Sequence, residues 1–226
     1  MLDDALARCR ERVADLASDV LARARGDGDL TDLLGAVWAA IEEELAAGRP
    51  AGSPVSACGP GCATCCTLNV GTLAIEGAVA AALLRRSVPA VELPQLARTL
   101  LSFHDRVRWL EDRERIVARL ACPFADPAGR CTIHAARPLA CRSISSLDPA
   151  ECRRALDERA DDEAGIVRMD WLQKVLHDTA RAALAEALAA RGLDARCRDV
   201  SGMTGAFLAG PAPVVAFLAG ERVPID

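Results

Sequence analysis

Four of the ten cysteines of this chain lie within nine residues, in the run CGPGCATCC. They are Cys58, Cys62, Cys65 and Cys66. The glycines and the proline between the first two cysteines let the backbone wrap closely, so that several sulfurs can turn inward. Such short spacings are typical of thiolate sites for zinc or iron–sulfur clusters. The run therefore favours a metal site over disulfides or small buried hydrophobic side chains.

Three more cysteines follow in the segments CPFADPAGRC and CTIHAARPLAC, at Cys122, Cys131 and Cys141. Between the first two, residues 126–129 read Asp-Pro-Ala-Gly, a good tight turn that would bring Cys122 towards Cys131. Seven thiols in motif context exceed the four ligands of a closed zinc site or of a cubane cluster. The surplus favours a polynuclear cluster. Two sites, or one site with an additional reactive or structural thiol, are the alternatives.

Arginines crowd the second cysteine group, where they would stabilise an anionic thiolate cluster. Arg137 and Arg142, both within RPLACR, are the predicted contacts to the cofactor. The alternatives are an anionic substrate or ordinary surface ion pairs. His134, three residues after Cys131, and Cys152, in a predicted first helical turn, stay open as further ligands.

The remaining cysteines and histidines are expected to lie outside the site. Cys9 fills an apolar position of a predicted helix, and Cys197 lies near a helix end. His104 and His177 lie in predicted amphipathic helices far from the motifs, so we expect structural roles for them. No catalytic residue is assigned from the sequence.

The N-terminal residues carry charges every few positions, without the apolar run of a secretory signal. No stretch offers the roughly 18 uninterrupted apolar residues of a membrane-spanning helix. We therefore expect a cytoplasmic protein, in which thiols stay reduced and dense cysteine patterns bind metal. A net charge of −5, with acids and bases interspersed, gives no electrostatic reason to expect nucleic acid or a membrane surface as partner. The expected partner is an unidentified protein or substrate.

Apolar periodicity predicts a mainly α fold, a helical domain with irregular cysteine-rich loops that form a metal site. Helices are expected at about 2–20, 30–45, 72–86, 94–120 and 169–190, and another is expected to start at Asp148-Pro149. Residues 1–50 would form a helical hairpin, 55–160 the cysteine-cluster metal-binding core, and 165–226 a C-terminal helix and apolar tail, all in one compact unit. The few aromatic residues imply a core of Leu, Ala, Val and Ile.

The pattern CxxxCxxCC, followed by CPF and CxIHxxRPxxCR, resembles the bacterial zinc- or iron-chelating cysteine-cluster family, often called the CxxCxxCC or YkgJ-like family. The resemblance covers about residues 58–142. It implies that all seven cysteines belong to the metal site, with Arg137, Pro138 and Arg142 as motif companions. The family commonly has Tyr where this chain has His134, so an aromatic contact is lost or a ligand gained.

Three functions are compatible with this pattern. We favour an iron–sulfur protein, with the cluster held mainly by the Cys58–Cys66 run, that transfers electrons, senses redox state or supports a partner enzyme. The second is a zinc-stapled interaction module. The third is a metalloenzyme, because flagellin lysine N-methylases have a similar motif; however, no glycine-rich loop for S-adenosylmethionine or a nucleotide is visible.

Overall fold

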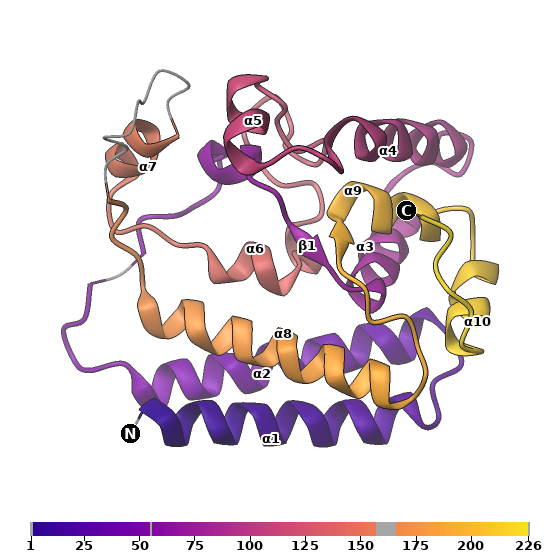
Figure 1. Ribbon diagram of the computed structural model, residues 1–226, viewed down its shortest axis with the longest axis horizontal. Helices are drawn as coiled ribbons and strands as arrows, with labels where there is room; N and C mark the ends of the chain where they lie inside the picture. The colour runs from indigo at the N-terminus through magenta and orange to yellow at the C-terminus, as the bar shows by residue number, and fades with distance from the viewer. Residues whose placement is uncertain (1, 55, 157–165, 226) are drawn as a thin grey trace.

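The computed structural model describes residues 2–54, 56–156 and 166–225, and it is mainly helical, as predicted (Figure 1). The elements are α1 (Leu2–Leu21), α2 (Asp27–Gly48), η1 (Thr64–Thr67), β1 (Gly71–Thr72), α3 (Ala74–Ser87), α4 (Leu93–Val107), α5 (Asp112–Val117), η2 (His134–Ala136), α6 (Leu139–Ser143), α7 (Pro149–Ala155), α8 (Trp171–Ala190), β2 (Arg198–Asp199), α9 (Val200–Phe207) and α10 (Ala212–Leu218). The segment limits predicted at 55, 160 and 165 lie outside the described residues, and the three-segment division stays a prediction.

The helices α1, α2 and α8 form one layer of the molecule (Figure 1). The apolar seam predicted for the first two helices is buried, from Cys9 and Val13 in α1 to Leu33 and Ile41 in α2. Helix α8 begins where the Asp170 carboxylate accepts a hydrogen bond from the Gln173 amide, a side-chain cap that satisfies a free N–H group. This layer supports α6, which carries one of the motif cysteines, on α8.

A second group of helices is built around α9, which packs against α3 and α4. Small residues allow the close approach: a Cβ atom on Gly77 would lie 2.9 Å from the Met203 carbonyl oxygen. A Cβ atom on Gly202 would lie 2.5 Å from the His104 ring. Two-residue strands β1 and β2 pair antiparallel at the start of these helices, with Gly71 opposite Asp199.

Two predictions about helix limits are wrong. The stretch 94–120 forms two helices, because the Glu114 carboxylate accepts a hydrogen bond from the Glu111 amide and starts α5 anew. The helix expected from residue 72 begins at Ala74, because Thr72 lies in β1 and the Glu76 carboxylate accepts from the Leu73 amide. The helix start at Asp148-Pro149 is confirmed, since the Asp148 side chain accepts from the Ala150 amide.

The apolar C-terminal tail, which the sequence left unassigned, forms α9 and α10. No single helix among the described residues has the length and apolar character needed to cross a membrane. The pair α9–α10 meets those criteria of length and composition only when taken together, with a bend of 107° between the two helices.

Candidate metal centre

The first cysteine loop carries Cys58 to Cys66. Just before it, the Ala57 amide donates a hydrogen bond to the Ser146 carbonyl at 2.8 Å, which ties the loop to the segment that follows Cys141. A tight turn follows, closed by the Cys62 amide and the Gly59 carbonyl. Gly61 takes a positive φ of 89° in this turn, which L-residues rarely adopt. The loop then runs into the 3-10 helix η1, which contains Cys65 and Cys66.

The second cysteine loop folds back at residues 126–129, as predicted. The Gly129 amide donates to the Asp126 carbonyl at 2.8 Å, and the Thr132 amide pairs with the Phe124 carbonyl at 2.8 Å. The Asp126 carboxylate also accepts from the Arg130 amide and its Nε, which fixes the turn. Because the two limbs lie side by side, both Cys122 and Cys131 face the same cavity.

Two contacts lock the first and second loops together. The Cys122 amide donates to the Cys66 carbonyl at 2.7 Å. The two turns also touch glycine to glycine: a Cβ atom on Gly129 would lie 2.6 Å from the Gly61 carbonyl oxygen. The small residues thus determine how closely the two sets of thiols approach.

The third segment brings Cys141 to the cavity on the short helix α6. The helix is held at its start by Glu76, whose buried carboxylate accepts from the Leu139 amide at 2.6 Å. The Arg137 guanidinium closes the segment by donating to the Cys141 carbonyl at 2.6 Å. Burial raises the pKa of Glu76, while its two backbone hydrogen bonds, from Leu139 and Leu73, lower it.

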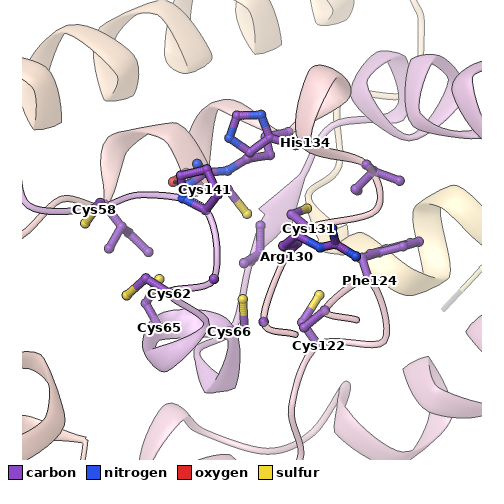
Figure 2. Close-up of a pocket in the computed structure, with 18 of the residues that line it drawn as sticks. Cys58, Cys62, Cys65, Cys66, Cys122, Phe124, Arg130, Cys131, His134 and Cys141 are labelled. Carbon is purple, nitrogen blue, oxygen red and sulfur yellow. Dashed lines mark hydrogen bonds between the residues drawn. The ribbon is translucent and has the colours of Figure 1, made fainter. Parts of the chain in front are cut away.

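All seven motif cysteines line a single cavity of about 560 Å³ (Figure 2). Its other walls are largely apolar, and Phe124, Ile133 and Val200 contribute to them. The structure therefore brings together every cysteine that the sequence assigned to the site, from three separate chain segments. None of these cysteines forms a disulfide.

The sulfurs form two groups in Figure 2. The central sulfur group, around the middle of the view, consists of Cys66, Cys122, Cys131 and Cys141. The lateral sulfur group, to one side, consists of Cys58, Cys62 and Cys65; Cys65 borders the central group, because its thiol is hydrogen-bonded to Cys66. The hydrogen bond from Cys65 lowers the pKa of Cys66, while burial and the charges of Cys122, Cys141 and Cys131 raise it, so Cys66 is coupled to all three other members of the central group. Only one member of the central group comes from the CGPGCATCC run.

Among the described residues, no three His, Cys, Asp or Glu side chains are grouped closely enough to hold a single metal ion. A mononuclear site in this cavity would therefore need the sulfurs to move inward. A polynuclear centre would reach sulfurs that stand further apart. The fit to a metal rests on the donors: seven thiols that face one cavity.

Ionisation of most of these thiols is unfavourable without a cation. Burial raises the pKa of Cys122 and of Cys141 to about 12, and it also raises that of Cys131. The thiol of Cys65 donates a hydrogen bond to Cys66, which raises the pKa of Cys65 and lowers that of Cys66. A bound metal would reverse this preference, because thiolates are its ligands.

The two predicted arginines differ in position. Arg137 lines the cavity, and its charge lowers the pKa of Cys65, Cys131 and Cys141 against the larger raising effects. Arg142 does not line it: its guanidinium donates to the Arg137 carbonyl and lies 4.3 Å from the centre of the Trp38 ring. Burial lowers the pKa of Arg142. Arg142 supports the segment that carries Cys141, while Arg137 faces the thiols.

His134 also lines the cavity, and burial together with the neighbouring arginines lowers its pKa, which favours the neutral imidazole that binds metals. Cys152 lies in α7 and does not line the cavity. Cys9 is fully buried in α1, next to the Leu176 carbonyl of α8. Cys197 lines a different cavity.

One buried arginine that sequence reasoning missed ties the loops to the rest of the fold. Arg115, 1% exposed, donates to the Leu120 carbonyl at 3.0 Å, two residues before Cys122. It also donates to the Asn69 side chain at 3.3 Å and to Asp199 at 3.2 Å. No sequence signal distinguishes Arg115 from its exposed neighbours. Glu76, in contrast, is the only acid in an otherwise apolar stretch, which is a readable signal of a special role.

Residues 57–163 match the model of the CxxCxxCC family, which is described as "Putative zinc- or iron-chelating domain". This segment is a CxxCxxCC domain. It includes all seven cavity cysteines and Arg115, whereas α1, α2 and α8–α10 lie outside it. Comparisons with curated proteins and with solved structures found no match.

This CxxCxxCC domain departs from the pattern in its name. Three residues, instead of two, separate Cys58 from Cys62, and Gly59 stands at the position of the first cysteine. In Figure 2 the sulfur of Cys58 is among those that lie to one side of the cavity. The longer spacing is consistent with a peripheral position for Cys58.

Proposed function

We propose that this chain is an iron–sulfur protein whose cluster is held mainly by the central sulfur group. The single observation that carries this proposal is the convergence of thiols from three segments on one cavity. Four cysteines are the usual ligand set of a cubane cluster, and the central group supplies four. This assignment shifts the main ligands away from the Cys58–Cys66 run, which contributes only Cys66 to the central group.

The protein's own groups would stabilise such a centre. The largely apolar walls lower the local polarity around the thiols, and the Arg137 guanidinium places a positive charge beside the thiolates. A bound cluster would supply one-electron redox chemistry, at a potential that charge, hydrogen bonds and solvent exposure set. We therefore infer a redox or enzyme-supporting role in the cytoplasm, with a protein partner or a substrate still to be identified.

Anaerobic spectroscopy tests the proposal. The purified protein should be brown, its visible absorption should bleach when dithionite is added, and the absorption should return on reoxidation. The variants Arg137→Gln and Arg86→Gln form a matched pair, because Arg86 is exposed on α3 and does not line the cavity. Removing the charge of Arg137 should lower the reduction potential, whereas the Arg86 variant should leave it unchanged. A colourless protein that contains one equivalent of zinc would contradict the proposal.

The irregular backbone of the three cysteine segments favours a second candidate, a zinc-stapled interaction module. Turns and short helices carry most of these thiols, and a metal would tie such segments together. Removal of the metal by a chelator would then unfold the domain, and dithionite would change no spectrum. Reversible bleaching would exclude this candidate.

A further inference from the structure

A second cavity, of about 420 Å³, lies behind one wall of the metal cavity. Val70 lines both cavities, while Asp199 lines the second and its neighbour Val200 lines the first. The short β1–β2 segment therefore separates them. The volume is within the range of small-molecule sites, roughly 300–1,000 Å³. None of the seven motif cysteines lines this cavity.

The cavity contains a guanidinium group that forms no salt bridge with any residue in the described part of the chain. Arg198 lines it, and its Nη1 donates to the neighbouring Cys197 carbonyl at 3.0 Å. The Nε of Arg198 is buried and has no hydrogen-bond acceptor within the described ranges, so the Nη atoms are the donors that a ligand in the cavity would meet. The adjacent carboxylate of Asp199 is already used by Arg115 at 3.2 Å and by the Ser201 amide at 2.9 Å. A planar guanidinium with free donors matches a carboxylate or a phosphate.

An aromatic ring lies beside the same cavity. Trp109, in the turn between α4 and α5, is 78% exposed, which is unusual for so large an apolar side chain. The guanidinium of Arg108 lies 5.1 Å from the centre of its ring, on the same cavity wall. This contact helps to hold the indole in place. Exposed aromatic rings held in this way are stacking platforms for planar ligands.

We propose that this cavity binds a small planar molecule that carries a phosphate or a carboxylate. The Arg198 guanidinium would receive the anionic group, and the Trp109 indole would stack on the planar ring. Because the chain as a whole carries a net charge of −5, attraction of an anion must come from local guanidinium groups. The site is separate from the cluster and does not depend on the proposed redox function.

Isothermal titration calorimetry on the full chain, purified with its metal, tests this site. Adenosine monophosphate is the probe for a phosphate, indole-3-acetate the probe for a carboxylate, and adenosine the uncharged control. At least one anionic probe should bind, adenosine should bind about ten-fold or more weakly than the monophosphate, and added salt should weaken anion binding. The tighter of the two anions identifies the group. Absence of binding by both anions would overturn the proposal.

Variants locate the binding site. Arg198→Gln should lower the affinity for the anion that binds by about ten-fold or more. Arg198→Lys should recover part of that loss, because lysine keeps the positive charge. Trp109→Ala should lower the affinity for both adenosine monophosphate and indole-3-acetate, because both carry a planar ring. Arg86→Gln, on an exposed face of α3, is the matched control and should bind like the wild type. Unchanged affinity in both Arg198 variants, with thermal melts and metal content like the wild type, would overturn the proposal.

Discussion

At the scale of single residues, Cys122, Cys131 and Cys141 of the central sulfur group are half-buried in an apolar cavity, where burial raises the pKa of their thiols and makes ionisation unfavourable. The pKa of about 12 for Cys122 and Cys141 describes thiols that stay protonated at neutral pH unless a cation binds. Arg137 partly offsets this preference. The site therefore requires metal binding and thiol ionisation to occur together.

Single Cys→Ser substitutions should separate the two sulfur groups. Replacing Cys66, Cys122, Cys131 or Cys141 should remove most of the bound iron, because a hydroxyl is a poor ligand for this soft centre. Cys58→Ser, at the lateral edge, should retain a larger fraction. Iron content per protein after anaerobic purification is the measurement.

The control variants in this series are Cys9→Ser and Cys197→Ser, which should retain the metal. Their cysteines lie in α1 and beside the second cavity, outside the metal cavity. If either control loses its iron, or if Cys58→Ser loses it while Cys141→Ser does not, the assignment of ligands is wrong.

At the scale of elements, the positions of the cysteine loops depend on residues that do not line the metal cavity. The side chain of Arg115 joins α5 to the Leu120 carbonyl, to Asn69 and to Asp199. Arg115 thereby links Asn69, which follows the first cysteine loop, with Leu120, which precedes the second. Because both charges of the Arg115–Asp199 pair are buried, loss of one partner is costly.

Arg115→Met should lower the free energy of unfolding by about 3–5 kcal/mol, because it leaves the Asp199 carboxylate buried without its partner. Adding Asp199→Asn removes that charge and should recover part of the loss, while the Asn side chain can still cap α9. Urea denaturation of the two single variants and of the double variant measures the coupling. Additive losses would show that the pair is not coupled.

Packing between α3 and α9 can be tested with a pair of glycine substitutions. Gly77→Ala should destabilise the protein by about 1–3 kcal/mol, because its new methyl group would meet the Met203 backbone. Gly35→Ala, on the exposed face of α2 with no atom within 4 Å of the new methyl, should stabilise it by about 0.5–1 kcal/mol. Thermal or urea denaturation measures the change in stability of each variant. Equal changes for Gly77→Ala and Gly35→Ala would contradict the close packing of α3 against α9.

Periodic and capped elements were predictable from the sequence, and tertiary features were not. The α1 and α2 seams, the turn at 126–129 and the cap at Asp148 all rest on local patterns. The break between α4 and α5 was missed because it follows from local hydrogen bonds and from Arg115 turning inward. The cysteines were predictable as members of one site, but their division into central and lateral groups depends on how three distant segments meet.

At the scale of the whole molecule, the chain joins a cysteine-lined cavity to two helical groups, one formed by α1, α2 and α8 and the other built around α9. The CxxCxxCC match covers the cavity, while most of the supporting helices lie outside it. Metal binding and folding are therefore expected to be coupled through the three cysteine segments.

The metal-free protein should lose stability as the pH rises from about 9 to about 12. In that range the unfolded chain ionises thiols whose ordinary pKa is near 9.0, while the folded state keeps Cys122 and Cys141 protonated. The unfolded state then binds fewer protons, so unfolding becomes more favourable. Urea denaturation across this range is the measurement. The chain has no tyrosine and only one lysine, so few other groups interfere.

Metal loading provides the control for this pH dependence. With thiolates already bound to metal, most of the alkaline loss should disappear, and the part due to buried Cys9, whose pKa is raised by burial to about 11, should persist. An identical pH profile with and without metal would contradict the assignment of Cys122 and Cys141 as ligands.

The central claim is tested most directly by the iron and acid-labile sulfide content of the protein purified without oxygen. The structure of the cavity and its central sulfur group predict iron and sulfide in equal amounts, close to four of each per chain for a cubane cluster. Iron-free protein with one equivalent of zinc and no sulfide would contradict the claim.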